Sequence, residues 1–290
     1  MNTPISWRSG PLTLLVLASC LSAQTDRSRV LVGGLIPAMK PLALDPATLS
    51  LQDPTADDGE AKWSSSIAVG IAMTSGNTQR RNANAGADVE RRLDKHRTSG
   101  KLAWDYAEQK DDTDTDYRVD QRHVQGSVKH DYFLAEKQYV FVGVGAENDY
   151  DKNISLRYTA AVGLGLQLIE EEDLSFSFEV GVGQTETQSS LMGVADTENM
   201  VAQVSTDLTW MVSEDVKLSN TVIAFPSLED GDDVFGSSDT KLEFPISEGG
   251  ALRTQIQWIV DYDNTPSLGS TGSPNDRVDH RLFLNLVWSF

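Results

Sequence analysis

Residues 280–290 read HRLFLNLVWSF, and the large apolar side chains of this stretch recur at every second position. They are Leu282, Leu284, Leu286, Trp288 and Phe290. Successive side chains of a β-strand point to opposite faces, so a period of two predicts a strand with one apolar face. The even positions form that face, and polar side chains such as Arg281 and Asn285 belong to the other.

The same alternation continues through the chain from Trp63 onward. Segments of about ten residues alternate between apolar and polar side chains. They predict twelve strands, over residues 63–74, 82–93, 98–109, 119–132, 138–149, 155–169, 174–187, 200–213, 216–226, 238–246, 251–263 and 278–290. Apolar spacing at i, i+3 and i+4 is scarce there, so the sequence predicts an all-β fold.

The connections between these strands alternate in length. Mostly long, polar gaps follow the odd-numbered strands, at 75–81, 110–118, 150–154, 188–199, 227–237 and 264–277. Short gaps follow the even-numbered strands, at 94–97, 133–137, 170–173, 214–215 and 247–250. Long extracellular loops and short periplasmic turns are typical of outer-membrane barrels. In hydrocarbon every backbone N–H and C=O needs a partner, so such a sheet must close on itself.

We therefore predict a transmembrane antiparallel up-and-down β-barrel of about twelve strands over residues 63–290. A secreted β-sandwich binding protein is the alternative fold, but its strands would be longer than the usual five or six residues.

The first 23 residues have the features of an export signal. Arg8 supplies a positive charge, and PLTLLVLAS at 11–19 is apolar but too short to span a membrane. Two processing routes stay open, cleavage after Ala23 or lipidation of Cys20 in the lipobox-like LASC. Cys20 is the only cysteine, so cleavage would leave no thiolate metal site or disulfide. Residues 24–62 contain four prolines and predict a flexible periplasmic lead-in.

The polar strand faces supply the candidate functional residues, which we expect to line the lumen. They are Asp88, Glu90, Arg92, Lys101, Asp105, Lys129, Arg157, Glu179, Asp207, Arg253, Asp261 and Arg281. With Asp131, Glu243 and Lys241 the inward set holds eight acids and seven bases. An ion-selective pore needs a ring of one sign, so this balance predicts a narrow or closed channel-like barrel with little ion selectivity. Small solutes or ions are its expected partners.

The net charge of −19 lies mainly outside the predicted lumen, in the lead-in and in loops such as 111–116 and 228–233. It argues against nucleic-acid binding. The acidic loops either gather divalent cations through their oxygen atoms or stay solvated and mutually repelling. No G-x-S-x-G or H-E-x-x-H motif occurs, so we expect no enzyme, catalytic residue, cofactor or metal. A lipase-like barrel enzyme is the alternative, and His130 on the lipid side would be its nearest candidate.

Glycines recur in three neighbouring predicted strands. They are Gly143, Gly145, Gly163, Gly165, Gly181 and Gly183. Two interpretations stay open, because glycine permits strong sheet curvature and also leaves room for inward side chains from across the lumen.

Three stretches together resemble an outer-membrane family called domain of unknown function 481, the salt-induced outer membrane protein type. They are IAVGIAMTSGNTQ (67–79), YDKNISLRYTAAVGLGLQLI (150–169) and the final WSF. The resemblance implies a porin-like barrel in the outer membrane of a Gram-negative bacterium, linked to envelope or salt stress, and no established activity. Trp288 and Phe290 look like the signal read by the barrel assembly machinery, which we expect as a partner together with outer-membrane lipids.

Overall fold

The computed structural model describes residues 61–74, 78–111, 114–247, 249–267 and 274–290. The predicted signal segment, Cys20 and nearly all of the lead-in lie outside them. The regular elements of the described residues are twelve strands: β1 (Lys62–Thr74), β2 (Thr78–Leu93), β3 (His96–Asp111), β4 (Arg118–Ala135), β5 (Gln138–Asp149), β6 (Ile154–Glu170), β7 (Leu174–Ser189), β8 (Thr197–Ser213), β9 (Val216–Pro226), β10 (Val234–Pro245), β11 (Leu252–Asp263) and β12 (Val278–Ser289). No helix among these residues is long and apolar enough to span a membrane.

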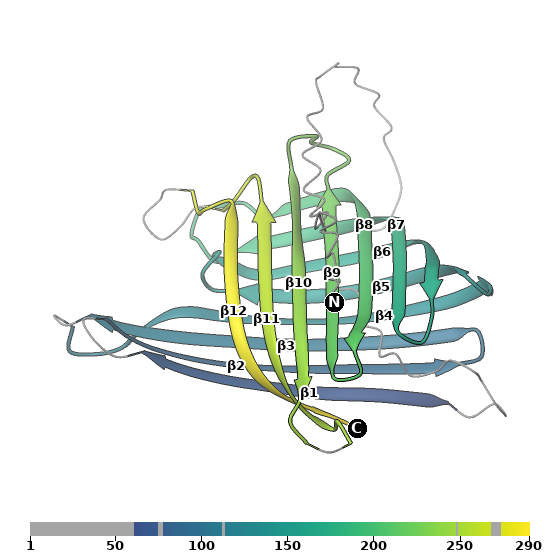
Figure 1. Ribbon diagram of the computed structural model, residues 1–290. Helices are drawn as coiled ribbons and strands as arrows, with labels where there is room; N and C mark the ends of the chain where they lie inside the picture. The colour runs from purple at the N-terminus through teal and green to yellow at the C-terminus, as the bar shows by residue number, and fades with distance from the viewer. Residues whose placement is uncertain (1–60, 75–77, 112–113, 248, 268–273) are drawn as a thin grey trace, which may run out of the picture. The chain divides into compact units, whose positions relative to one another are not determined.

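Each strand pairs antiparallel with its neighbour in sequence, and β12 pairs with β1, so the sheet closes (Figure 1). This closure confirms the predicted fold class, an antiparallel up-and-down barrel of twelve strands. Eight of the twelve strands extend one to four residues past a predicted end, because the backbone ladder continues past the last large apolar side chain, whereas β5 and β9 match the prediction and β11 and β12 are one residue shorter.

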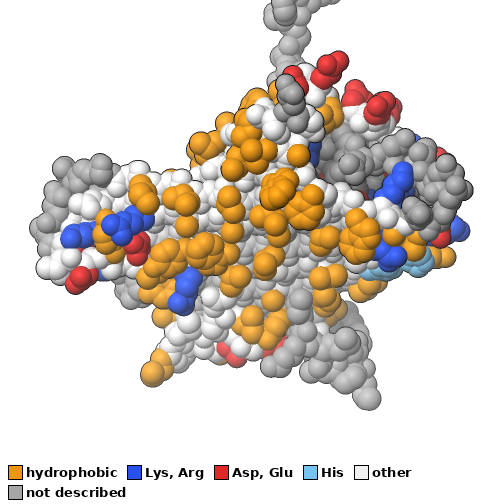
Figure 2. Space-filling view, turned by 90° about the horizontal axis from the view of Figure 1, so that it is seen from below, with side chains coloured by type: hydrophobic (Ala, Val, Ile, Leu, Met, Phe, Trp, Pro, Cys, Tyr) orange, Lys and Arg blue, Asp and Glu red, His pale blue; other side chains and the backbone are white. Residues whose placement is uncertain are grey.

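The wall of the barrel separates apolar from polar side chains. On β4, Val128 and Leu134 are exposed outward, whereas Lys129 and Asp131 are buried inside. The same division holds on β12, where Leu282 is exposed and Asn285 is buried. Hydrophobic side chains are spread over the face seen in Figure 2, and most charged side chains there lie towards its margins. An apolar outer face around a polar interior is the arrangement of a transmembrane barrel.

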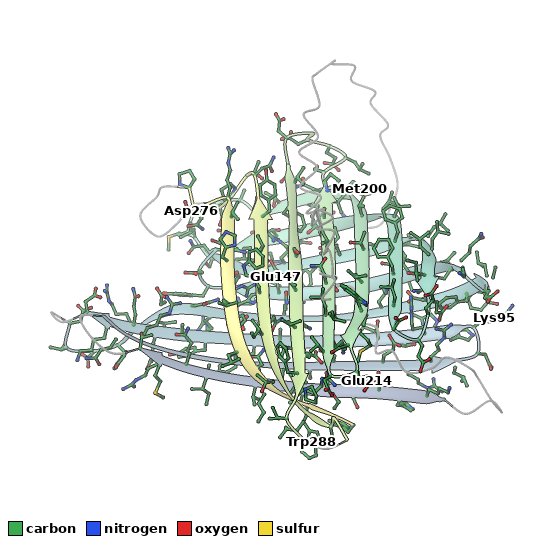
Figure 3. The ribbon with its side chains drawn as sticks, in the orientation of Figure 1. Lys95, Glu147, Met200, Glu214, Asp276 and Trp288 are labelled. Atoms are coloured by element: carbon green, nitrogen blue, oxygen red, sulfur yellow. The ribbon has the colours of Figure 1, made fainter. Side chains whose placement is uncertain are left out.

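The connections differ at the two ends. The turn end carries the short connections 94–95, 136–137, 171–173, 214–215 and 246–251, and the loop end carries 75–77, 112–117, 150–153, 190–196, 227–233 and 264–277. Figure 3 labels Lys95 and Glu214 in two of the turns and Asp276 in the last loop. The first connection was predicted as seven residues but spans three, because β1 and β2 pair as far as Thr74 and Arg80.

Candidate functional site

One part of the barrel interior is filled by aromatic side chains. Phe133, Tyr139 and Phe141 form a buried cluster with Ile223 and Phe225 from β9. The ring centroids of Phe133 and Tyr139 lie 5.0 Å apart. This packing leaves the polar space of the lumen to the other side of the barrel.

The glycines of β6 accommodate these rings. Gly165 lies directly opposite Tyr139 in the sheet, and Gly163 lies opposite Phe141. A Cβ atom at Gly165 would lie 2.2 Å from the Tyr139 ring, and one at Gly163 would lie 2.7 Å from the Phe141 ring. The glycines therefore make room for inward side chains, but these come from the adjacent strand and not from across the lumen.

A chain of buried charges borders the aromatic cluster. The Arg97 Nε lies 2.6 Å from an Asp131 carboxylate oxygen, and the Lys129 Nζ lies 3.5 Å from the other oxygen. Lys129 also pairs with Glu179, to which the Tyr139 hydroxyl donates a hydrogen bond of 2.8 Å. All five side chains are buried, so these alternating charges compensate one another where water has little access.

A cavity of about 430 Å³ occupies the other part of the interior. Its lining extends from Ser64 and Gly250 near the turn end to Lys152 and Asp263 at the loop end. It is bounded mainly by β1–β4 and β9–β12, and Phe225 and Phe235 form its border with the aromatic cluster. The polar space is therefore continuous along much of the barrel and lies away from β7 and β8, which contribute none of its described lining residues.

Seven of the twelve candidate residues predicted from the sequence line this cavity. They are Asp88, Glu90, Lys101, Asp105, Arg157, Asp261 and Arg281. Lys129, Glu179 and Asp207 are buried in the polar interior beside it. Arg92 pairs with Glu170 at 2.9 Å, and Arg253 lies 3.2 Å from Glu243.

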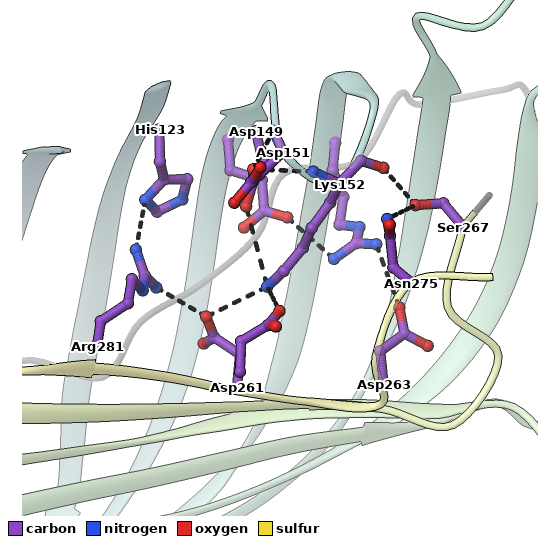
Figure 4. A network of polar contacts seen from close by, with 12 residues as sticks. His123, Asp149, Asp151, Lys152, Asp261, Asp263, Ser267, Asn275 and Arg281 are labelled. Atoms are coloured by element: carbon purple, nitrogen blue, oxygen red, sulfur yellow. Dashed lines mark hydrogen bonds and ion pairs between the residues drawn. The ribbon is translucent and has the colours of Figure 1, made fainter. Parts of the chain in front are cut away.

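Arg281 of β12 crosses the cavity to the strands on the other side. Its guanidinium lies 2.9 Å from Asp105 of β3 on that other side. It also lies 2.8 Å from Asp261 of the neighbouring strand β11 (Figure 4). Its Nη1 also lies 3.0 Å from the Nδ1 atom of His123 on β4. This side chain therefore joins β11 and β12 to β3 and β4 across the cavity and narrows it.

Lys152 makes a second connection at the loop end, from the β5–β6 loop. Its Nζ lies 3.2 Å from Asp261 and 3.5 Å from Asp279. Burial alone would lower the pKa of this ammonium, but the charges of Asp261 and Asp149 raise it above its usual value. Lys152 therefore stays charged and holds this loop over the mouth of the cavity.

Asp151, next to Lys152, lies among other carboxylates. Partial burial, and then the like charges of Asp149 and Asp120, raise the pKa of the Asp151 carboxyl to about 6. The loop end of the cavity therefore carries an excess of acidic groups.

The charges that line the cavity are a different set from the predicted inward residues, and acids outnumber bases among them. Among the described lining residues the acids are Asp88, Glu90, Asp105, Glu147, Asp149, Asp239, Glu243, Asp261 and Asp263. The Lys and Arg residues are Lys101, Lys152, Arg157, Lys217, Lys241 and Arg281. Most of them are paired, as in Arg157–Glu147 at 2.9 Å and Lys241–Asp239 at 3.4 Å.

Several of these residues were missed from the sequence for identifiable reasons. Lys152 lies in a loop, where alternation says nothing about direction. Glu147 and Asp149 lie on β5, whose middle alternates valine with glycine, so neither face is clearly polar. Their parity with Tyr139 and Phe141, all odd-numbered, is the signal that could have placed them inside.

The remaining sequence hypotheses concern the outer wall and the loops. His130 lies on the outer face, with Nδ1 2.8 Å from the Thr98 hydroxyl and Nε2 3.2 Å from His96. Arg118 pairs with Asp114 at 3.1 Å in the acidic loop 111–116, and Asp112 lies outside the described residues. In the described part of the chain no group of three or more His, Cys, Asp or Glu residues could hold a metal ion.

The family model described as protein of unknown function, DUF481, matches residues 67–290. The chain belongs to the DUF481 family. For this DUF481 protein the match spans all the cavity-lining positions from β2 to β12. A search of curated proteins gives no match.

Solved structures similar to the DUF481 chain include a porin, a translocator domain of an autotransporter and an outer membrane channel. The NanC porin is 11% identical with a TM-score of 0.45, covering 77% of this chain and 98% of its own. The translocator domain of the autotransporter NalP from Neisseria meningitidis is 8% identical with a TM-score of 0.42, covering 82% and 90%. The outer membrane channel DcaP of Acinetobacter baumannii is 10% identical with a TM-score of 0.35, covering 84% and 100%.

Proposed function

We propose that this DUF481 protein is an outer-membrane barrel that admits small polar solutes or ions through a narrow lumen, with a weak preference for cations. The observation that carries the proposal is the cavity of about 430 Å³, lined by charges that are mostly paired. Its size falls within the range of small-molecule sites, roughly 300–1,000 Å³.

The paired charges explain why the proposed passage is narrow. Arg281 spans the cavity between β12 and β3, and Lys152 links the β5–β6 loop to β11. Strong selectivity needs a ring of one sign, whereas here nearly every cation has a carboxylate partner. The excess of acids among the described lining residues favours cations only weakly.

Several observations support the location and the setting of this proposal. The family match, the apolar outer wall and the export-like first 23 residues agree with an outer-membrane location. We assign the turn end to the periplasm and the loop end to the exterior, since long loops are extracellular in such barrels. We also propose that the protein acts under envelope or salt stress, and growth of a deletion strain at high salt would test this role.

Reconstitution in planar bilayers tests the passage. We expect a small, noisy conductance with a weak cation preference in the natural protein. Arg281→Ala removes the side chain that crosses the cavity and should raise the conductance about twofold or more. The control Arg118→Ala removes an exposed arginine at the loop end of β4 and should leave the conductance unchanged. A wide and steadily open pore with strong selectivity would overturn the proposal. The absence of any conductance in both the natural protein and Arg281→Ala would also overturn it.

A further inference from the structure

Nearly all charged side chains that line the cavity stand in ion pairs. Among its described lining residues, five of the six Lys and Arg side chains have a carboxylate within 4.0 Å. Eight of the nine acidic side chains likewise have a cation within 4.0 Å. The two exceptions are Lys101 of β3 and Glu90 of β2. The lining therefore carries one cation and one anion for which the described residues provide no ion pair.

The same two residues also lack hydrogen bonds at their charged ends. The Lys101 Nζ and the Glu90 Oε2 are buried and have no hydrogen-bond partner among the described residues. They are the only side-chain atoms of the described lining with this property. A buried charged group without a partner destabilises the folded state, and a ligand group of opposite charge would offset that cost. Each of the two groups is therefore suited to bind a ligand group of the opposite sign.

Glu90 and Lys101 are diagonal neighbours on the inner wall. Glu90 lies directly opposite Ser99 in the sheet, and Lys101 is two residues beyond Ser99 on β3. Diagonal neighbours of an antiparallel pair are about 7–8 Å apart. The two side chains form no ion pair with each other, so there is room for a small molecule between their charged groups. An α-amino acid carries an ammonium group and a carboxylate on one carbon atom, so a single molecule reaches both.

Two carboxylates lie near Lys101, and both have other partners. Asp88 stands opposite Lys101 in the sheet, but the Lys241 Nζ lies 3.8 Å from its carboxylate. Asp207 of β8 accepts a hydrogen bond of 2.7 Å from the Thr221 hydroxyl and does not belong to the cavity lining. The Lys101 ammonium is therefore the group that a ligand carboxylate meets on this wall.

The cations near Glu90 are engaged in the same way. They are Arg92, Arg97 and Lys129, and none of them lines the cavity. Arg97 and Lys129 share Asp131, at 2.6 and 3.5 Å. A cationic group of a ligand in the cavity therefore meets the Glu90 carboxylate and not these side chains.

Small side chains make room beside the two unpaired charges. Ala68, Gly86 and Ala103 stand opposite one another across β1, β2 and β3, and all three line the cavity. They lie on the loop-end side of Lys101. Because no large side chain projects from this part of the wall, the space next to Lys101 and Glu90 admits the body of a small ligand.

We propose that this part of the cavity binds a small zwitterion of the α-amino acid class, with its carboxylate at Lys101 and its ammonium group at Glu90. The inference rests on the proposed function and deepens it, because it names the class of solute that the lumen takes. A simple ion would satisfy only one of the two unpaired groups. A zwitterion satisfies both and has no net charge, so it also fits a lumen whose other charges are paired.

Isothermal titration calorimetry of the purified barrel in detergent tests the site. The probes are L-alanine, propionate, which lacks the ammonium group, and ethylamine, which lacks the carboxylate. We expect alanine to bind at least about tenfold more tightly than either of the other two. Calorimetry needs no ion current, so the two proposals fail separately. Alanine binding by a barrel without conductance would refute the passage alone, and conductance without alanine binding would refute the site alone.

Two substitutions assign the charges of the ligand to their partners. Lys101→Met removes the ammonium group of the wall, and alanine should then bind no more tightly than ethylamine. Glu90→Gln removes the carboxylate, and alanine should then bind no more tightly than propionate. The matched controls Lys95→Met and Glu214→Gln remove exposed charges from turns of the barrel (Figure 3). Both controls should keep the tenfold preference for alanine.

Three results would overturn the proposal. The first is binding of propionate or ethylamine by the natural protein as tight as that of alanine, or no binding of alanine. The second is a preference for alanine that survives Lys101→Met or Glu90→Gln. The third is binding of glycerol, which is polar but uncharged, as tight as that of alanine. If a variant does not fold, the comparison of the four probes on the natural protein decides.

Discussion

Replacing Asp131 by alanine should destabilise the barrel more than any substitution in its loops. The Asp131 side chain lies between Arg97 at 2.6 Å and Lys129 at 3.5 Å, and the whole residue is 0% exposed. Arg97 is 3% exposed, and its Nη1 has no hydrogen-bond partner among the described residues. Alanine leaves the guanidinium buried without its counter-charge, which costs about 3–5 kcal/mol. Lys129 keeps Glu179 as a partner, so the loss concerns mainly Arg97.

The free energy of unfolding can be measured by urea titration in detergent micelles, followed by tryptophan fluorescence and linear extrapolation. Asp114→Ala is the matched control. It breaks the exposed pair with Arg118 at 3.1 Å and should cost less than about 1 kcal/mol. The double variant Arg97→Met/Asp131→Leu replaces the buried pair by apolar side chains and should recover most of the lost stability, because isosteric apolar replacement avoids the desolvation of both charges.

A decrease of less than about 1 kcal/mol in the free energy of unfolding of Asp131→Ala would refute this prediction, because a buried arginine without a counter-charge destabilises a protein by more than that. A double variant as unstable as Asp131→Ala would show that the cost comes from packing and not from the unpaired charge.

Three further predictions concern a glycine, the C-terminal residue and a loop. Gly165→Ala places a Cβ atom 2.2 Å from the buried Tyr139 ring and should cost about 1–3 kcal/mol in the same urea titration. Deleting Phe290 removes two backbone hydrogen bonds to Ser65 and should lower the yield of heat-modifiable barrel in outer-membrane fractions. Folding raises the pKa of the Asp151 carboxyl to about 6, so the folded state binds this proton more tightly than the unfolded state does. Its contribution to the free energy of unfolding should therefore be fully present below the usual pKa of roughly 4 and be lost as the pH rises through 6. Asp151→Asn should therefore flatten the pH dependence of unfolding in this window.

Each of these predictions has a control on the same chain. Gly86→Ala, whose Cβ atom would lie 3.7 Å from its nearest neighbour, should change the stability by less than about 0.5 kcal/mol. An equal loss at both glycines would contradict the steric argument. Ser289→Ala should assemble normally, and equal assembly of the Phe290 deletion would count against a role of Phe290. An unchanged pH profile in Asp151→Asn would assign the titration to another group.

Much of the architecture was predictable because side-chain direction in a strand is a local property. The alternation from Trp63 onward located all twelve strands, and parity placed residues such as Lys129 and Arg281 on the inward face. The strand ends were less predictable, since the backbone ladder extends past the last large apolar side chain and shortens the loops.

Contacts across the lumen required the closed barrel, because they join strands far apart in sequence. Arg281 meets Asp105 across 176 positions, and Lys129 meets Glu179 across 50. Alternation reports which face a side chain occupies, but it does not report which side chain stands opposite. That depends on strand register and closure, so the filled side and the cavity beside it are properties of the tertiary structure.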